Sequence, residues 1–273
     1  MEKITLVVPT YKDLHYLRLC LESFANSVYK HDVLVAVSYD NLRSDETVTY
    51  LGENRIRYLL RHRQASDVNA AINEAVRQSD TEYVLVAMAD MVFPKNWDAW
   101  LVDWPLRPNI VLSGQVVEPG NEGVSPYYIE KDFGRTNADF REEEFSDWYL
   151  GNYQIDLINS FQVRPGIGIP FIIQRDLWLD AGGFDLRYEG ASTSETDLFY
   201  RLALRGDIQL LRYMPFLVYH FQGGTDKKCR DATAWAAAGR ERFFAKWGFQ
   251  HTYQLGGVPK FPGGYTAGMR SLA

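Results

Sequence analysis

The sequence predicts an α/β protein with a mixed, mostly parallel central sheet that is flanked by helices. In the first third of the chain, short β-branched runs alternate with segments of helical periodicity, which is typical of βαβ units. The composition, with 46% hydrophobic and 23% charged residues, is that of a globular protein with a sizeable core. The length of 273 residues fits one large α/β domain or two small ones.

The first half of the chain is expected to contain four strands, at residues 4–8, 33–37, 57–60 and 83–88. The spacing of apolar residues predicts a helix after the first strand, with Asp13 as its N-cap, and a helix that begins after Ser66. A third helix is expected to carry Trp97, Trp100 and Trp104 on a face that packs into the core.

The second half is expected to add strands at residues 110–117, 168–174, 209–212 and 216–219, and helices at residues 176–181, 197–204 and 231–247. A long polar and aromatic segment, residues 118–164, separates the first two of these strands. Its charge run at residues 141–144 is expected to form a solvated helix face or a loop. A segment of this length with little pattern is usually functional or mobile.

Charge and motif content exclude several classes of function. The net charge of −6 argues against an overall attraction to nucleic acid or anionic lipid, so any phosphate contact must be local. The sequence contains neither GxGxxG nor GxxxxGK[ST], which argues against a dinucleotide-dependent dehydrogenase and a P-loop nucleotidase. GxSxG and HExxH are absent as well.

The cysteine content and the hydropathy pattern favour a cytoplasmic protein. Cys20 and Cys229 lie far apart and outside any metal-ligand spacing, so a reducing compartment is expected. No run of about 18 apolar residues predicts a transmembrane segment, and the sequence leaves peripheral membrane association open.

Polar residues stand where the predicted strands end. Pro9, Thr10 and Tyr11 follow the first strand, Asp40 the second and Asp90 the fourth. Ligands of open α/β sheets bind at the carboxyl ends of the strands, so these residues are expected to line a binding crevice. An ordinary strand exit would explain Pro9 and Thr10 equally well.

Short motifs follow one another along nearly the whole chain. They are ITLVVPTYKDLHYLRLCLESF, Ser38-Tyr39-Asp40 with Ser44-Asp45-Glu46-Thr47, Ala71-Ile72-Asn73, YVLVAMADMVFPKNW, Gly182-Gly183-Phe184-Asp185, Glu195-Thr196-Asp197-Leu198 with Arg201, VYHFQGGT and Lys246-Trp247-Gly248. In this order they resemble the motifs of inverting glycosyltransferases of family 2, whose nucleotide-sugar-binding fold is called GT-A. Each motif alone is common, whereas the ordered set is specific.

The resemblance implies a GT-A-like, Rossmann-type domain over residues 1–225, followed by a C-terminal helical tail, residues 226–273. Residues 1–117 would bind the nucleotide sugar and residues 118–225 the acceptor. The implied reaction is a hexosyltransferase-type transfer, with inversion, from a nucleotide-diphosphate sugar to a hydroxyl of a glycan or another carbohydrate or lipid-linked acceptor, as in polysaccharide biosynthesis.

The same resemblance implies which residues bind the donor. The residues implied to bind the nucleotide are Pro9, Thr10, Tyr11, Asp40 and Asn73. Lys227 and Lys228 follow the histidine motif and would close over the diphosphate, although a basic loop after glycines is also ordinary surface.

A divalent cation, Mn²⁺ or Mg²⁺, is the implied cofactor, with Asp90 and His220 as its ligands. Asp90 matches the last aspartate of the family's DxD motif, but Met88 stands where the first aspartate is expected. Methionine offers no hard oxygen ligand, so weaker metal binding is expected, and a metal-independent variant stays open. His220 could instead be a core histidine with satisfied nitrogens.

A glycosyl transfer needs a base that accepts the proton of the acceptor hydroxyl. Alignment of Asp197-Leu198 and Arg201 with the family's DL-x-x-R places Glu195 at the position of the base, with Asp197 in reserve. Either carboxylate could instead favour the first turn of a helix through its charge.

Aromatic residues crowd the long polar segment. They could stack on an acceptor sugar or form a satellite core under a long loop; they are Tyr127, Tyr128, Phe133, Phe140, Phe145, Trp148, Tyr149 and Tyr153. Because of Met88, a catalytically impaired nucleotide- or carbohydrate-binding protein is the alternative function. A nucleotidyltransferase is disfavoured because no glycine-rich, basic loop follows the first strand.

Overall fold

The computed structural model describes residues 3–39, 46–62, 67–102, 106–120, 128–153, 163–165, 168–188, 192–221 and 232–250. These residues form a ten-stranded sheet in the order β3-β2-β1-β4-β9-β6-β10-β5, with β7 beside β6 and β8 beside β10. The strands are β1 (Ile4–Thr10), β2 (Asp32–Tyr39), β3 (Arg57–His62), β4 (Tyr83–Val86), β5 (Met91–Val92), β6 (Ile110–Glu118), β7 (Tyr128–Glu130), β8 (Val163–Pro165), β9 (Phe171–Gln174) and β10 (Gln209–His220).

The sheet is mixed and mostly parallel, as the sequence predicts. β1 pairs in parallel with β2 and β4, and β6 pairs in parallel with β7 and β10. β9 runs antiparallel between β4 and β6, and the short β5 runs antiparallel to β10. β1, β4, β6 and β10 therefore all point in one direction and end at one edge of the sheet.

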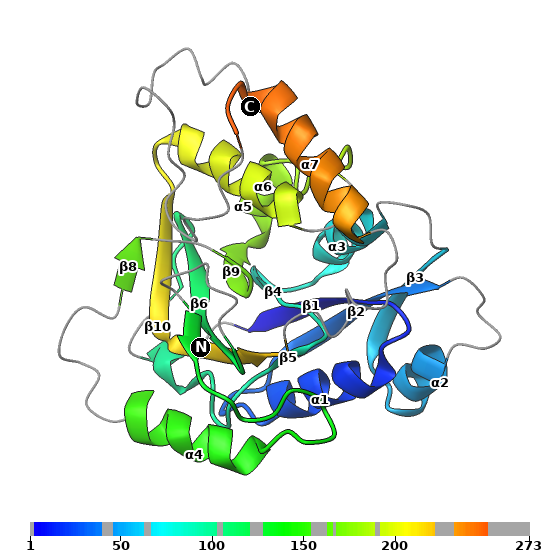
Figure 1. The fold of residues 1–273 in the computed structure, drawn as a ribbon, viewed down its shortest axis with the longest axis vertical. Helices are drawn as coiled ribbons and strands as arrows, with labels where there is room; N and C mark the ends of the chain where they lie inside the picture. The colour runs from blue at the N-terminus through cyan, green and yellow to red at the C-terminus, as the bar shows by residue number, and fades with distance from the viewer. Residues whose placement is uncertain are drawn as a thin grey trace.

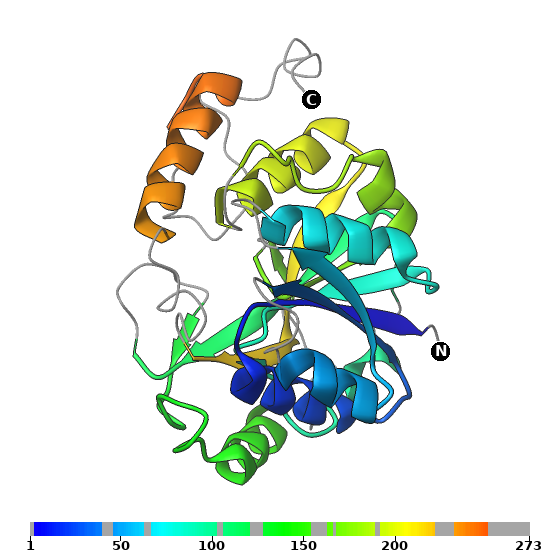
Figure 2. The ribbon, with the colours of Figure 1, turned by 90° about the vertical axis from the view of Figure 1, so that its right-hand side faces the viewer.

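Helices cover both faces of the sheet (Figures 1 and 2). They are α1 (Leu14–Ala25), α2 (Glu46–Glu53), α3 (Asp67–Gln78), α4 (Glu142–Tyr153), α5 (Arg175–Asp180), α6 (Ser192–Arg205) and α7 (Ala232–Trp247). α1 and α2 lie on one face, α3, α5 and α6 lie on the other, and α7 lies outside α6. Among the described residues, no helix is long and apolar enough to cross a bilayer.

The alternation of side chains along the strands divides the core between the two faces. In β1, Leu6 and Val8 pack in the cluster that contains α1 residues, whereas Val7 packs in the cluster that contains α3 residues. All three side chains are fully buried. Successive side chains of a strand point to opposite faces of the sheet. A strand that is apolar at every position is therefore covered on both faces.

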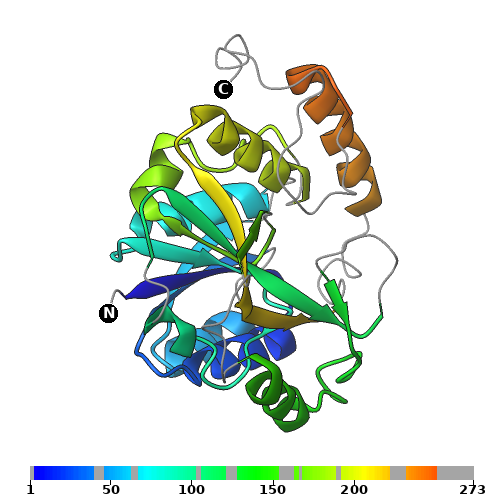
Figure 3. The same ribbon diagram turned by 90° about the vertical axis from the view of Figure 1, so that its left-hand side faces the viewer.

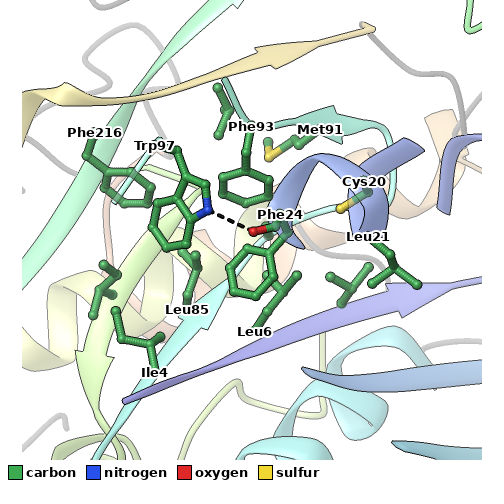
Figure 4. Close-up of a cluster of buried hydrophobic side chains, with 14 of the residues drawn as sticks. Ile4, Leu6, Cys20, Leu21, Phe24, Leu85, Met91, Phe93, Trp97 and Phe216 are labelled. Carbon is green, nitrogen blue, oxygen red and sulfur yellow. Dashed lines mark hydrogen bonds between the residues drawn. The ribbon is translucent and has the colours of Figure 1, made fainter. Parts of the chain in front are cut away.

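Trp97 lies at the centre of the core on the α1 face (Figure 4). Its indole Nε1 donates a 3.0 Å hydrogen bond to the carbonyl oxygen of Phe24, and its ring stacks on that of Phe24 at a centroid distance of 5.0 Å. Trp97 and Trp100 are both buried, which confirms the core interpretation; Trp104 lies outside the described residues.

The predicted helix around these tryptophans is wrong. The chain forms only a short 3₁₀ turn at Ala99–Val102. Asn96 has a φ of +58° and donates its backbone N–H to Asn26, and the buried carboxylate of Asp98 accepts the amide N–H groups of Val28 and Tyr29. These contacts with a loop about 70 residues earlier override the helical spacing.

Other boundaries differ from the prediction for local reasons. The expected strands at residues 209–212 and 216–219 are one strand, β10, with a register shift between Arg212 and Leu217. The expected strand at residues 168–174 begins only at Phe171, after Pro170, which has no amide N–H for the ladder. Asp13 precedes α1, but its side chain makes no capping hydrogen bond.

The aromatic residues of the long polar segment form a satellite core rather than an open platform. Phe133, Phe145 and Tyr149 are buried, and they pack with Tyr219 and Phe221 at the end of β10. The charge run at residues 141–144 forms the start of α4. Tyr127 lies outside the described residues.

We expect Trp97→Ala to lower the free energy of unfolding by about 3–5 kcal/mol, because the substitution leaves a cavity among Phe24, Phe93 and Phe216. Urea denaturation followed by circular dichroism measures the change. Val102→Ala, at a position with 63% exposure, is the control and should shift the value by less than about 0.5 kcal/mol. Equal effects of the two substitutions would contradict the placement of Trp97 in the core.

Candidate active site

The carboxyl ends of β6 and β10 bring two titratable side chains, Glu118 and His220, together with Asp90. Val117 and Tyr219 are register partners in the parallel ladder, so Glu118 and His220 follow side by side. Figure 3 shows the ends of β6 and β10 beside each other. β5 pairs antiparallel with the end of β10 and places Met91 opposite His220. The backbone N–H of Phe221 donates to the carbonyl oxygen of Asp90 at 3.2 Å.

His220 lies between two buried carboxylates. Its Nδ1 is 2.7 Å from Oε1 of Glu118, and its Nε2 is 3.6 Å from Oδ1 of Asp90. Burial alone would lower the pKa of His220, but the neighbouring carboxylates of Asp90 and Glu118 outweigh burial and raise the pKa to about 10. Both ring nitrogens of His220 therefore face acidic side chains.

The donor set at this position fits a divalent cation that displaces the proton of Nε2 of His220, since only the neutral imidazole is a ligand. The distance between Nε2 of His220 and the carboxylate of Asp90 is longer than that of a good hydrogen bond. Glu118 is hydrogen-bonded to the other ring nitrogen, as is typical of a carboxylate that orients a metal-bound histidine. The described part of the chain holds no group of three or more His, Cys, Asp or Glu side chains suited to a metal. The protein would therefore supply two ligands, and substrate oxygens or water the rest.

Met88 adds nothing to this donor set. Its side chain packs against the core on the α1 face, and its carbonyl oxygen accepts the backbone N–H of Met91 at 3.2 Å. The thiol of Cys20 lies 3.7 Å from the same oxygen, and burial raises the pKa of that thiol.

The end of β1 holds the residues for which the family resemblance implies nucleotide binding. Pro9 lies within the strand, Thr10 is its last residue and Tyr11 follows, half-buried. Thr10 is only 3% exposed, and its Oγ1 has no hydrogen-bond partner among the described residues. A buried hydroxyl without a partner costs stability, so this atom is a candidate to bind a ligand. Asp40, Lys227 and Lys228 lie outside the described residues.

Asn73 does not reach this edge. Its Oδ1 accepts the backbone N–H of Phe184 and its Nδ2 donates to the carbonyl of Phe184, both at 2.8 Å. One turn earlier on α3, Asn69 donates to the carbonyl of Tyr188 and accepts from Oγ of Ser194. The two asparagines fasten the segment between α5 and α6. The sequence analysis missed Asn69, although its i, i+4 spacing to Asn73 is a signal for a shared face.

Glu195 lies in the first turn of α6 and points toward the segment before β9. Its Oε1 accepts the backbone N–H of Ile169 at 3.0 Å. Burial raises the pKa of Glu195 to about 7, although the Ile169 amide and the positive charge of Arg212 oppose the shift. The group therefore changes protonation state near neutral pH, as a general base does.

Asp197 has a different environment. It is fully buried, and its carboxylate accepts hydrogen bonds from four groups: the Tyr188 hydroxyl, Nε of Arg201, Nζ of Lys246 and Nε1 of Trp247. A carboxylate with four hydrogen-bond donors is fixed in place.

Arg212 and Tyr128 lie between Glu195 and the cluster formed by Asp90, Glu118 and His220. A Cβ on Gly168 would come within 4 Å of both Nη2 of Arg212 and Oε1 of Glu195, so the guanidinium and the carboxylate approach one point. Burial and then the charges of Glu118 and Glu195 raise the pKa of Tyr128 to about 12. The charges of Glu118 and Glu195 therefore both act on the Tyr128 hydroxyl.

The sequence analysis did not identify Glu118 or Arg212 as site residues. The strand-end rule that found Asp90 would also have found Glu118, the last residue of β6. Arg212 is a charged residue within an otherwise apolar strand and is 2% exposed, which is itself a signal for a polar partner.

An open cleft of about 550 Å³ lies elsewhere, between α3, α5, α6 and α7. Its cations are already paired within the protein: Arg201 bonds Asp197, and Lys246 bonds Asp185 and Asp197.

Solved structures of glycosyltransferases share this fold at low sequence identity. A mannosyltransferase from Pyrobaculum calidifontis, solved in complex with GDP-Man and Mn²⁺, superposes with a TM-score of 0.57 at 15% identity, over 89% of this chain and 64% of that one. TarS residues 1–349 from S. aureus, solved in complex with UDP, superposes with a TM-score of 0.53 at 14% identity, over 90% of this chain and 72% of that one.

The chain spans slightly less than two thirds of the length of the archaeal mannosyltransferase. A search of curated protein sequences finds no match. The sequence model described as "Glycosyl transferase family 2" matches residues 5–168, more than half of the chain. With the mixed GT-A sheet in place, this match shows that the chain belongs to glycosyl transferase family 2.

Proposed function

We propose that this protein transfers a hexosyl group, with inversion, from a nucleotide-diphosphate sugar to a hydroxyl of a carbohydrate or lipid-linked acceptor. The observation that carries this proposal is Glu195, a carboxyl group with a pKa of about 7 in the first turn of α6. Inverting transfer requires one base of this kind on the acceptor side of the anomeric carbon.

In the proposed reaction, Glu195 accepts the proton of the acceptor hydroxyl while that oxygen bonds to the anomeric carbon. The bond from the anomeric carbon to the diphosphate oxygen breaks on the opposite face, and the diphosphate leaves with the electron pair. A bound Mn²⁺ or Mg²⁺ would supply Lewis-acid stabilisation of the leaving group. Asp90 and His220 would hold the cation, and Glu118 fixes the imidazole ring.

Donor binding is assigned to Thr10 and Tyr11 at the end of β1, and by the family resemblance to Asp40 and to the cationic side chains of Lys227 and Lys228. Asn73 is better explained as a structural residue that holds the segment at Phe184 in place, because its amide oxygen and its amide nitrogen both form hydrogen bonds with the backbone of Phe184. GDP and UDP, the nucleotides in the two solved relatives, are the first to test by thermal shift.

Of the two candidate bases, Glu195 is favoured over Asp197. Four donors already engage the carboxylate of Asp197, so it is less open to an acceptor hydroxyl. Among the described residues, Glu195 has one hydrogen-bond donor, Ile169, and its pKa of about 7 suits proton uptake near neutral pH.

A nucleotide- or carbohydrate-binding protein without transfer activity is the second candidate, favoured by Met88 in place of a metal-binding carboxylate. Incubation with nucleotide sugars and Mn²⁺ separates the two functions, since slow hydrolysis of the donor is expected only of a competent site. Binding without hydrolysis or transfer across a panel of donors would favour the second candidate.

We expect Thr10→Val to weaken binding of a nucleoside diphosphate by about 2- to 10-fold, the value of one ordinary hydrogen bond. Because Oγ1 of Thr10 has no partner among the described residues, the same substitution should leave the melting temperature unchanged or raise it. Calorimetry and thermal unfolding measure the two effects. A loss of stability with unchanged nucleotide affinity would exclude Thr10 from the site.

We expect Asp90→Asn to abolish the gain in donor affinity that Mn²⁺ gives the wild type, because the amide replaces the charged ligand of the cation. Glu118→Gln should reduce metal affinity by about 10- to 100-fold through loss of the partner of His220. Calorimetric titration with and without Mn²⁺ measures both. Glu130→Gln is the matched control, because Glu130 is exposed and is the register partner of Glu118 on β7. An unchanged Mn²⁺ effect in Asp90→Asn would remove Asp90 from the metal site.

We expect Glu195→Gln to lower kcat by about 100-fold or more while the affinity for the donor stays unchanged. In the wild type, kcat should rise about tenfold per pH unit below pH 7 and level off above it, because the base must be deprotonated. Glu241→Gln, an exposed position on α7, is the control.

The stability of these variants gives an independent reading of Glu195. Its folded-state pKa lies above the ordinary value of 4.5, so the folded protein binds more protons than the unfolded chain between those values and loses stability as the pH rises through this window. Glu195→Gln should therefore raise the melting temperature at pH 8 and have little effect at pH 4. Full activity in this variant would exclude Glu195 as the base.

A further inference from the structure

We propose that the C-terminal helix α7 positions Glu195 by fixing the turn of α6 that carries it. α7 does so through Gly239, which contacts Thr193, and through Lys246 and Trp247, which bind Asp197. This inference rests on the proposed role of Glu195 as the base, and it assigns a task in the reaction to residues outside the matched range 5–168.

The first attachment is polar and buried. Nζ of Lys246 lies 2.8 Å from Oδ1 of Asp197, and Nε1 of Trp247 donates to the same oxygen at 2.9 Å. Oδ2 of Asp197 accepts from Nε of Arg201 at 2.8 Å, within α6 itself. Asp197 is fully buried, so loss of either α7 donor leaves a carboxylate that water cannot easily reach.

The second attachment is a close approach of the two helices. A Cβ on Gly239 would lie 2.6 Å from Oγ1 and 3.1 Å from Cβ of Thr193, a separation that only glycine permits. Thr193 is 3% exposed. Further along, the ring of Tyr200 packs against Phe243 and Trp247 at centroid distances of 5.4 and 5.5 Å.

These contacts leave Glu195 on the other side of its helix. Thr193, Asp197, Tyr200 and Leu204 are spaced by three or four residues and form the stripe of α6 that faces α7. Glu195 is two residues from Thr193, about 200° around the helix, and its carboxylate meets the amide of Ile169 instead.

The turn of Glu195 is thus held on several sides. Ser194 donates to Oδ1 of Asn69 on α3, while the residues at positions 193 and 197 are held by α7. Figures 1 and 2 show α7 lying along α6 at the outside of the molecule. A misplacement of about 1 Å in a reacting group can cost about 100-fold in rate, so this fixation matters for the chemical step.

Two variants test the polar attachment with little change in shape. Trp247→Phe removes the indole N–H and keeps an aromatic ring beside Tyr200 and Phe243, and Lys246→Met removes the ammonium and keeps the apolar stem. We expect each to lower kcat at least 10-fold, with donor affinity within twofold of the wild type. The acid limb of the kcat profile should also move below pH 7, because a looser turn exposes Glu195 to water.

Matched variants separate positioning from stability. Phe244→Ala changes a residue of the same helix that is 48% exposed and should leave kcat and the pH profile unchanged. Lys246→Arg keeps the positive charge and should restore most of the lost rate. Gly239→Ala should lower kcat by displacing α7 from Thr193, and the double variant Gly239→Ala/Thr193→Ala, which removes the hydroxyl in the way, should recover it. All assays are run well below each variant's melting temperature.

The proposal is overturned if Trp247→Phe and Lys246→Met keep the wild-type kcat and pH profile, or if donor affinity falls in step with kcat. Its failure differs from failure of the proposed function. If Glu195→Gln is inactive while both α7 variants are fully active, the base assignment holds and only the positioning role of α7 is lost. If Glu195→Gln retains full activity, the base assignment and this inference fall together.

Discussion

The shared direction of β1, β4, β6 and β10 is the constraint on which the site depends. These strands all end at one edge of the sheet, and the antiparallel β5 brings residue 91 opposite His220 at that edge. Asp90, Glu118 and His220 are therefore juxtaposed by backbone pairing, before any interaction between their side chains. The contact between α6 and α7 belongs to the opposite helical layer, and it lies next to the turn of the proposed base, Glu195.

The sequence predicts the strands of four or more residues, most helices and the edge at which the parallel strands end, because periodicity and strand ends are local features. It does not predict the short strands β5, β7 and β8. It does not predict the helix boundaries that distant contacts decide. The spacing of apolar residues around Asp98 predicts a helix. The carboxylate of Asp98 instead accepts hydrogen bonds from the amides of Val28 and Tyr29, and the chain there forms only a 3₁₀ turn. Two patterned segments near residues 212 and 217 become one strand because both continue the ladder with β6 across a register shift.

The candidate site residues also divide into those that the local sequence predicts and those that distant contacts decide. Asp90 and His220 are predicted from strand ends and from the family resemblance, and the structure brings them within 3.6 Å of each other. The position of Asn73 in a motif suggests nucleotide binding, but the amide is used by Phe184, which is 111 residues away. Nothing in the local sequence indicates that pairing, nor the approach of Arg212 toward Gly168 and Glu195, since each partner comes from a different element.

Glu195 and Asp197 show why the environment, and not the residue type, divides the roles of two carboxylates in one helical turn. Asp197 is surrounded by donors from α6, α7 and Tyr188, so its charge is stabilised and its position is fixed. Glu195 is half-buried and has one amide donor among the described residues, so desolvation destabilises its charge and raises its pKa to about 7, the range where a base is useful. The stable carboxylate holds the helical turn in which the destabilised one lies. In the proposed reaction, a desolvated base therefore lies next to a hydrogen-bonded structural carboxylate, the arrangement expected where reactivity must be kept without loss of the fold.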